Sequence, residues 1–371
     1  MKNFFSSLLT IIIILLITLQ LPFSFQAKPT KRSLDYEYVM RDALKNKNPY
    51  VTKVAMLGAH DALSEGIKYN SKAAEGESGI VVHPAAKILA KGLIVRMSRT
   101  QNADAKELLY SGVRYLDVRI TKSYGDYYTY HAYLSGYLRR YLIDVVEFLE
   151  THEGEFIIFD IQHFLREEKA TEEERNAQIV ELINYIGSIK TENGHSLLDF
   201  VYYNAHSNSL SELRYNDVTE NGTKGGVIIL TKGLETEYSY RRDSDASYED
   251  TSYYSIRSYW HDTNNTKEML LGINDEYLYI LNHQDLVEGK FVINQAQKTA
   301  FQANKTMVRS LFGWSVLDMN ARFNKKAIRN KDFSKWLSVM PIYMVDSATS
   351  RKGNFNKRVN ELIISYNEGL E

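Results

Sequence analysis

The chain has 371 residues, of which 44% are hydrophobic and 25% charged, so it can bury a large core like an ordinary globular protein. Its formal net charge of -1 argues against a nucleic-acid partner, because there is no basic excess to attract a phosphate backbone. The absence of cysteine excludes disulfides, thiolate metal sites, a cysteine nucleophile and a cysteine-linked lipid anchor.

The first 27 residues have the pattern of a secretory leader. Lys2 precedes an apolar run over residues 8–21, which is shorter than the roughly 20 residues of a membrane span. We expect a signal peptide cleaved after Ala27, with an uncleaved anchor as the alternative. Either interpretation predicts a secreted or cell-surface protein, with residues 28–49 as an N-terminal extension.

Short runs rich in Val, Ile, Leu, Phe and Tyr predict strands along the rest of the chain. They cover residues 54–58, 115–120, 127–131, 156–161, 227–231, 277–281 and 342–346. Helical patterns lie between and after them, at residues 142–150 and 355–366. A further helix is predicted to begin at Thr171, which forms a capping box with Glu174.

Strands alternating with helices indicate parallel crossover units, and near-continuous apolar runs indicate a sheet covered on both faces. No linker or repeat divides residues 50–371. We therefore expect one α/β domain there, with a (β/α) barrel as the best fit. A doubly wound open sheet would give the same pattern. No glycine-rich phosphate loop follows a predicted strand, which disfavours the nucleotide-binding version of that alternative.

Polar and ionisable side chains lie at or just beyond the ends of the predicted strands. They are His60, Asp61, Asp117, Arg119, His131, Asp160, Gln162, Lys232 and Asp346. In a parallel barrel these strand ends meet at one rim, which is where the active site lies.

This set of side chains suits attack on a phosphate diester. His60 and His131 can serve as base and acid near neutral pH. Asp346 can fix the tautomer of one imidazole. Arg119 offers a planar cationic fork to phosphate oxygens, and Asp61 can pair with it.

A metal site is the alternative use of the same residues. His60, Asp61, Asp117 and His131 could bind a cation, but Arg119 among them would repel a divalent ion. The sequence therefore favours a site with no metal and no other cofactor.

Several segments resemble the X domain of phosphatidylinositol-specific phospholipase C (PI-PLC). Residues 57–62 (LGAHDA) resemble its Gly-(Thr/Ser)-His-Asp-Ser opening, residues 100–119 its "TQ…EQL…GVRYLDLR" segment, and residues 148–164 its "FL…HP.EVVILDFNHF" stretch. Tyr130-His131 and residues 342–346 match the strands that supply a histidine and a late aspartate. The likeness covers residue 50 to the C-terminus and is strongest up to His163.

The resemblance implies a distorted TIM barrel that cleaves phosphatidylinositol to diacylglycerol and inositol cyclic phosphate. His60, oriented by Asp346, would deprotonate the inositol 2-hydroxyl, and His131 would protonate the leaving glycerol oxygen. Arg119, braced by Asp61, would stabilise the pentacoordinate phosphorus. Calcium-dependent members carry a carboxylate at the Arg119 position, so the likeness is to the metal-independent branch.

The resemblance also implies a substrate pocket and a membrane partner. Lys232 would contact the inositol hydroxyls, with Asp117 and Gln162 near the same pocket. The enzyme would associate transiently with a membrane surface that carries its phospholipid substrate. Ala59 and Ala62 depart from the hydroxyl residues usual in the opening motif, but neither position performs the chemistry.

Two segments leave alternatives open. Residues 66–99 mix apolar and basic side chains, as expected of either an interfacial helix or a helix packed on the barrel end. Residues 253–262 are where we expect further headgroup contacts. Rival functions are a same-fold phosphodiesterase for another lipid headgroup and a non-catalytic headgroup-binding protein.

Overall fold

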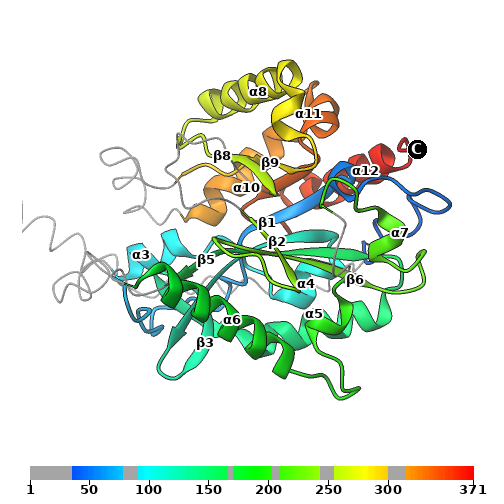
Figure 1. Cartoon of the computed structure of the whole chain (residues 1–371). Coiled ribbons are helices and arrows are strands. Elements are labelled where there is room, and N and C mark those ends of the chain that lie inside the picture. The colour runs from blue at the N-terminus through cyan, green and yellow to red at the C-terminus, as the bar shows by residue number, and fades with distance from the viewer. Residues whose placement is uncertain (1–35, 78–90, 166–169, 203–208, 243–254, 300–314) are drawn as a thin grey trace, which may run out of the picture.

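A ten-stranded sheet, counted over the described residues, forms the centre of the molecule. The computed structural model describes residues 36–77, 91–165, 170–202, 209–242, 255–299 and 315–371. The strand order is β7-β6-β5-β2-β1-β10-β9-β8, and every neighbouring pair on this path is parallel. The sheet curls, with helices around its outside (Figure 1). The predicted α/β fold, a distorted TIM barrel, is confirmed.

The strands have the following bounds: β1 Met56–Ala62, β2 Val113–Ser123, β3 Asp126–His131, β4 Tyr133–Tyr137, β5 Phe156–Leu165, β6 Gly226–Thr231, β7 Ser239–Arg241, β8 Ile256–Tyr259, β9 Phe291–Gln295 and β10 Ile342–Val345. Each predicted strand except the one at residues 277–281 overlaps an observed one.

The α-helices are α3 Lys91–Ser98, α4 Ala105–Tyr110, α5 Leu138–Thr151, α6 Glu172–Ser188, α7 Tyr215–Val218, α8 Thr266–Asn282, α10 Val316–Ala327, α11 Phe333–Val339 and α12 Phe355–Asn367. Short 3-10 helices are η1 Val51–Lys53, η3 Leu197–Phe200, η4 Gln284–Val287 and η5 Lys352–Asn354. The predicted capping box between Thr171 and Glu174 begins α6. In Figure 1, α5 and α6 lie along the lower side of the sheet and α8 and α11 along the upper side.

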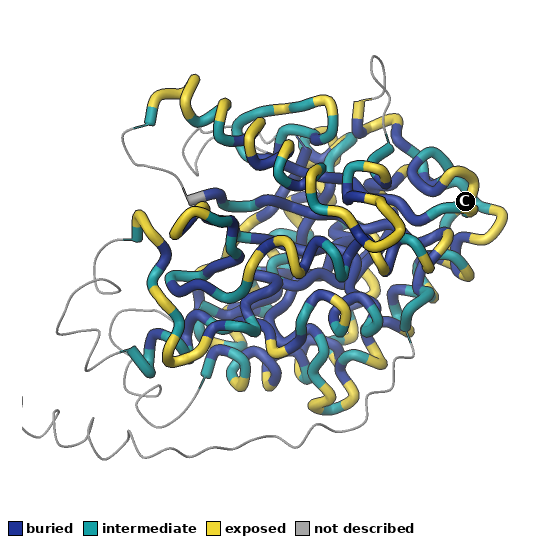
Figure 2. Tube along the Cα trace, turned by 90° about the horizontal axis from the view of Figure 1, so that it is seen from below, coloured by how far each residue is buried: buried dark blue, intermediate teal, exposed yellow. Residues whose placement is uncertain are grey.

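Both faces of the sheet are buried, as the apolar strand runs predict. Along β1, Met56 belongs to the cluster inside the barrel, while Leu57 belongs to the cluster under the outer helices. The same alternation holds along β5, with Ile158 inside and Ile157 outside. Figure 2 shows the buried trace running through the middle of the molecule and the exposed stretches around it.

The two ends of the sheet are joined by little main-chain bonding. β7 and β8 do not pair with each other as strands within the described residues. A hydrogen bond of 3.2 Å, from the Ser255 N–H to the Arg242 carbonyl, links the residue before β8 to the residue after β7. The barrel is thus nearly open at this seam.

The predicted strand at residues 277–281 is wrong, because this segment belongs to α8. Met269, Ile273 and Ile280 are the buried residues of that helix, and they follow the spacing of one helical face. A run of five apolar and aromatic residues does not by itself distinguish a strand from the end of a long helix.

The strand that ends at His131 is present, but its direction differs from the prediction. β3 pairs antiparallel with β2, so it is the return strand of a hairpin and not a parallel barrel strand. The hairpin is long enough for β3 to run back toward the rim. His131 therefore reaches the site by a different route from the one that the strand pattern suggested.

Several predictions concern residues that the structure describes in part or not at all. The leader (residues 1–27) and part of the 28–49 extension lie outside the described residues, so both stay predictions. The segment 66–99 contains α3 in its described part. Among the described residues, none of the helices combines the length and the apolar character needed to cross a bilayer.

Candidate active site

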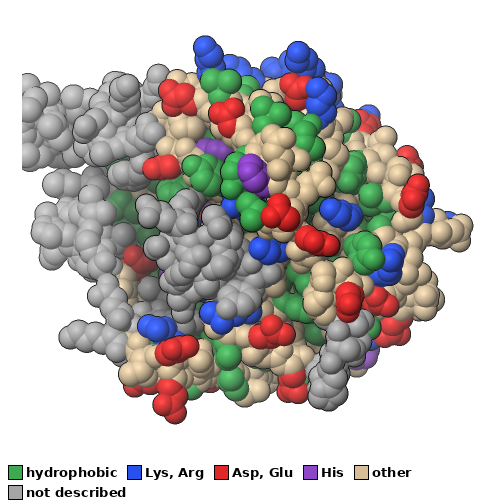
Figure 3. Space-filling model, turned by 45° about the horizontal axis from the view of Figure 1, so that its top comes forward, with side chains coloured by type: hydrophobic (Ala, Val, Ile, Leu, Met, Phe, Trp, Pro, Cys, Tyr) green, Lys and Arg blue, Asp and Glu red, His purple; other side chains and the backbone are tan. Residues whose placement is uncertain are grey.

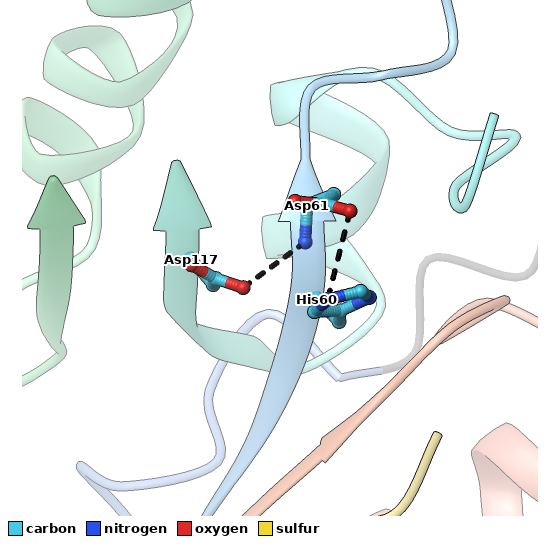
Figure 4. A group of neighbouring side chains, drawn as sticks. All are labelled: His60, Asp61 and Asp117. Carbon is cyan, nitrogen blue, oxygen red and sulfur yellow. Dashed lines mark hydrogen bonds and ion pairs between the residues drawn. The ribbon is translucent and has the colours of Figure 1, made fainter. Parts of the chain in front are cut away.

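His60 and Asp61 lie at a β-bulge near the end of β1. Between Ala59 and Ala62, β1 has one residue more than the paired part of β2. Asp61 has a left-handed backbone with φ 40°, and its N–H donates to Asp117 Oδ2 at 3.2 Å. In a regular strand, two consecutive side chains would point to opposite faces. The bulge redirects them, so that both reach one site (Figure 4).

His60 is held from behind by a buried carboxylate. Its Nδ1 lies 2.7 Å from Asp346 Oδ1, directly after β10, the parallel neighbour of β1. Asp346 is fixed in turn by α10. Asn320 Nδ2 donates to Asp346 Oδ2 at 2.5 Å, and Asn324 Nδ2 donates to the Asp346 carbonyl at 2.8 Å. With Nδ1–H bound to this carboxylate, Nε2 is the ring nitrogen of His60 that can exchange a proton with a substrate.

Thr100 and Gln101, which precede α4, hydrogen-bond the backbone of this site. Gln101 Nε2 donates to the carbonyls of His60 and Val345, both at 2.9 Å, and so joins the ends of β1 and β10. Thr100 Oγ1 donates to the carbonyls of His60 and Asp61 at 3.0 and 3.1 Å. The sequence motif contains Thr100 and Gln101, but only the fold reveals what they hold.

Asp61 is the common partner of the three cationic or basic groups. Arg119 Nε pairs with Asp61 Oδ1. Asp61 Oδ2 lies 3.1 Å from His131 Nδ1 and 3.5 Å from His60 Nε2. His131 Nδ1 also lies 2.8 Å from the Ser98 carbonyl, so its Nδ1–H has acceptors and its Nε2 is left for a ligand. The predicted Asp61–Arg119 pair is present, and the contact with His131 is new.

The two imidazoles have opposite pKa shifts. Burial disfavours the charged form of both. At His60 the carboxylates of Asp61 and Asp346 outweigh burial and raise the pKa to about 9. At His131 burial, aided by the charge of Arg119, outweighs the attraction of Asp61 and lowers the pKa. Burial of Asp61 is itself outweighed by Arg119 and the histidines, so its pKa is lowered and it stays a carboxylate.

The site presents its basic groups outward and its carboxylates inward. The side chains of His60, Arg119 and His131 are 19%, 27% and 28% exposed, whereas that of Asp61 is 1% exposed. An anion approaching the rim therefore meets donors before it meets carboxylates. A base, a potential acid and a fixed guanidinium suit in-line displacement at phosphorus.

One group of side chains has metal-ligand spacing. His60, Asp61 and Asp117 offer ligand atoms within 4.8 Å of one another, the sole such group in the described part of the chain. Asp61 Oδ1 already faces Arg119, and Asp117 Oδ2 accepts the Asp61 N–H. The Arg119 guanidinium already supplies the positive charge beside Asp61 and would repel a divalent ion, so the residues present fit such an ion poorly.

The three predicted substrate residues lie on neighbouring strands. Asp117, on β2, is 2% exposed, and burial raises its pKa to about 6. Gln162 is the extra residue of a second bulge, since Val118 pairs with Ile161 and the next residue of β2 pairs with His163. Lys232 directly follows β6, the next strand after β5. Their place near the pocket rests on strand order, and their roles stay predictions.

A buried network beneath the rim was not predicted. Asp160, cross-strand partner of Asp117, accepts the Tyr115 hydroxyl hydrogen bond and two bonds from Arg242 Nε at 2.8 and 2.9 Å. The apolar run that leads into Asp160 was visible in the sequence, but its partner Arg242 lies 82 residues away. The network links β2, β5 and the end of β7.

The sequence is similar to PI-PLC X-domain proteins. No protein-family model matches it. It is 30% identical over 121 residues to mouse PI-PLC X domain-containing protein 2, covering 32% of this chain and 36% of that protein. It is 34% identical over 125 residues to the variant-surface-glycoprotein phospholipase C of Trypanosoma brucei brucei, covering 31% of this chain and 35% of that protein. The matches thus span about a third of these curated relatives.

The fold is similar to bacterial PI-PLC structures. A Staphylococcus aureus PI-PLC matches with a TM-score of 0.57 and 15% identity, over 85% of this chain and 93% of that chain. The PI-PLC of Listeria monocytogenes matches with a TM-score of 0.54 and 15% identity, over 89% of this chain and 98% of that chain.

Proposed function

Because this chain is related to the PI-PLC X-domain family and has its barrel fold, we propose that it is a phosphodiesterase of the phospholipase C type. Its substrate is phosphatidylinositol or a related phosphodiester, cleaved without a metal ion to diacylglycerol and inositol cyclic phosphate. The relatives named phospholipase C support the reaction class and a phospholipid at a membrane surface as the partner.

The proposed reaction uses each group of the site once. His60 Nε2 accepts the proton of the inositol 2-hydroxyl, and the resulting oxygen attacks phosphorus. The bond from phosphorus to the glycerol oxygen breaks, and protonated His131 donates the proton that this oxygen needs. Arg119 stabilises the charge on the phosphoryl oxygens during the displacement.

The observation that carries this proposal is the placement of Asp61. Its one carboxylate contacts Arg119 and His131 and lies 3.5 Å from His60 Nε2. Base, acid and guanidinium are therefore held around one point at the rim, although they come from three strands. A binding protein without turnover would not need two imidazoles at that point.

The test measures diacylglycerol and inositol cyclic phosphate released from phosphatidylinositol vesicles by the full chain. We expect release to resist excess chelator. His60→Ala and His131→Ala should each lose about 10²-fold or more in kcat, because acid and base act together. His195→Ala is the matched control, since that histidine is 53% exposed and contacts Glu150 instead of the site.

Other outcomes would change the proposal in defined ways. Activity abolished by chelator would contradict the metal-free mechanism. Near-normal turnover in either histidine variant would contradict the assigned roles. A folded protein inactive on this lipid but active on another phosphodiester would keep the reaction class and change the headgroup.

A further inference from the structure

A second polar groove lies on the outer helix layer. It has a volume of about 610 Å³ and runs between the first half of α8 and the segment that joins α10 to α11. Its apolar lining includes Leu270 and Leu271, and the buried ring of Trp336 forms part of its wall. None of the residues assigned to the catalytic rim lines it.

The groove is rich in hydrogen-bond donors that the fold does not use. Lys267 and Lys326 line it, and neither side-chain ammonium has a partner among the described residues. The same holds for the side-chain amide of Asn274. Asn330 accepts the Asp332 N–H through Oδ1, which leaves its Nδ2 donors unused within the described chain. The buried indole N–H of Trp336 also lacks an acceptor there.

The α10–α11 side of the groove carries an excess of basic side chains, whereas α8 carries Lys267 together with Glu268, Asp275 and Glu276. Residues 321–335 contain six basic side chains and one acidic side chain, in a protein whose net charge is -1. These basic residues are Arg322, Lys325, Lys326, Arg329, Lys331 and Lys335. The one carboxylate, Asp332, pairs with Lys335 at 2.9 Å, which offsets its repulsion of an anion. Lys and Arg side chains, with some acidic ones among them, lie along the upper edge of Figure 3.

We propose that this groove is a second binding site, for a phosphate group. Two lysine ammonium groups and two amide groups can surround phosphate oxygens from opposite walls, with α8 on one side and the α10–α11 segment on the other. The leucines give the site an apolar border, so the phosphate can belong to a free anion or to a phospholipid headgroup. The proposal does not depend on the catalytic mechanism, because it uses none of the catalytic residues.

The test follows the indole N–H resonance of Trp336 in the full-length protein, assigned with Trp336→Phe. The protein is titrated separately with inorganic phosphate and with dihexanoylphosphatidylglycerol below its micelle concentration. We expect a saturable shift, and a dissociation constant about tenfold or more weaker in the Lys267→Gln/Lys326→Gln double variant, which removes both charged donors. Turnover of a soluble phosphodiester should be unchanged in this variant.

The matched control is Lys357→Gln on α12, an exposed lysine paired with Glu361 at 3.7 Å. It should keep the dissociation constant within about twofold, as expected for a surface charge remote from the groove. A lysine-dependent response to inorganic phosphate assigns a free anion, and a response to the lipid alone assigns a headgroup. No saturable shift with either probe, or a shift that the double variant retains, would overturn the proposal.

Discussion

Asp61 shows how one residue can organise a site of several charges. Its carboxylate is almost fully buried, and a buried carboxylate is costly unless cations or donors compensate it. Arg119 and the two imidazoles supply that compensation. The same contacts therefore stabilise the carboxylate and hold the basic groups at fixed distances from one another.

At the residue scale we predict a change in pH dependence for Asp346→Asn. The proposed reaction needs one proton on the pair of imidazoles, so activity is lost on the alkaline side when His60 also becomes neutral. The pKa of His60 is about 9 against an ordinary value of 6.5, and Asp346 is one of its causes. Removing that carboxylate lowers the pKa, and the alkaline limb of kcat/KM should move to lower pH.

A pH profile of kcat/KM, with an NMR titration of His60 in the same variant, measures this shift. Asp199→Asn is the control, since its carboxylate contacts Ser196 and lies in a different part of the chain. An alkaline limb that stays in place while the His60 titration moves would mean that His60 is not the base.

At the element scale, α10 acts as a support for the catalytic strands. Two of its asparagines, one turn apart, bond the side chain and the carbonyl of Asp346. Helix and strand are thus joined through the residue that orients His60. Small errors in such a support lower the rate more than they lower substrate binding.

We therefore predict that Asn320→Ala reduces kcat about tenfold or more and changes KM little, because Asp346 loses a donor and its fixed position. Steady-state kinetics measure both constants. Asn356→Ala is a matched control, since that side chain donates to main-chain carbonyls of Ser111 and Ala348. Equal losses in kcat/KM for the two variants, with equal losses of stability, would indicate a general structural role for Asn320.

The elements also show what could be predicted from the sequence and what could not. The strands that carry His60 and Asp117, and the strand that ends just before Asp346, were predictable, because apolar runs beside ionisable residues are local patterns. The bulges at Asp61 and Gln162 were not, because they depend on which residue of the neighbouring strand lies opposite. The antiparallel direction of β3 was missed for the same reason, whereas the strand predicted at residues 277–281 was wrong because a short apolar run does not by itself exclude a helix. The hydrogen bonds by which Gln101 and Asn320 support the site could be identified only once the fold was known.

At the scale of the whole molecule, β7 and β8 form a seam in the barrel, since they do not pair with each other as strands within the described residues. Among the described residues, one main-chain hydrogen bond from Ser255 to Arg242 crosses it, and Arg242 is anchored to Asp160 on β5. The buried ion pair thus holds the end of β7 in place from inside the barrel. Regions with few main-chain bonds open locally at low free energy.

Hydrogen exchange should reveal this difference. We predict that amides of β7 and β8 exchange faster than those of β1, β2, β5 and β10, and that Arg242→Ala speeds exchange at the seam further. That variant should also lower the free energy of unfolding by about 3–5 kcal/mol, because it removes a cationic partner of the buried Asp160 carboxylate. The double variant Arg242→Ala/Asp160→Asn should recover part of the lost free energy of unfolding. Uniform exchange around the barrel would contradict the prediction.

The opposed pKa shifts of His60 and His131 have a consequence for the resting enzyme. At neutral pH the proton that the two rings share resides mainly on His60, whereas the proposed reaction starts with it on His131. The productive microstate is then a minority form of the free protein. A diester anion arriving beside Arg119 and His131 favours the transfer of charge to His131, so the substrate recruits its own acid. Turnover and affinity would then depend on the same proton. An uncharged analogue of the substrate would leave that proton on His60, where the proposed reaction cannot use it.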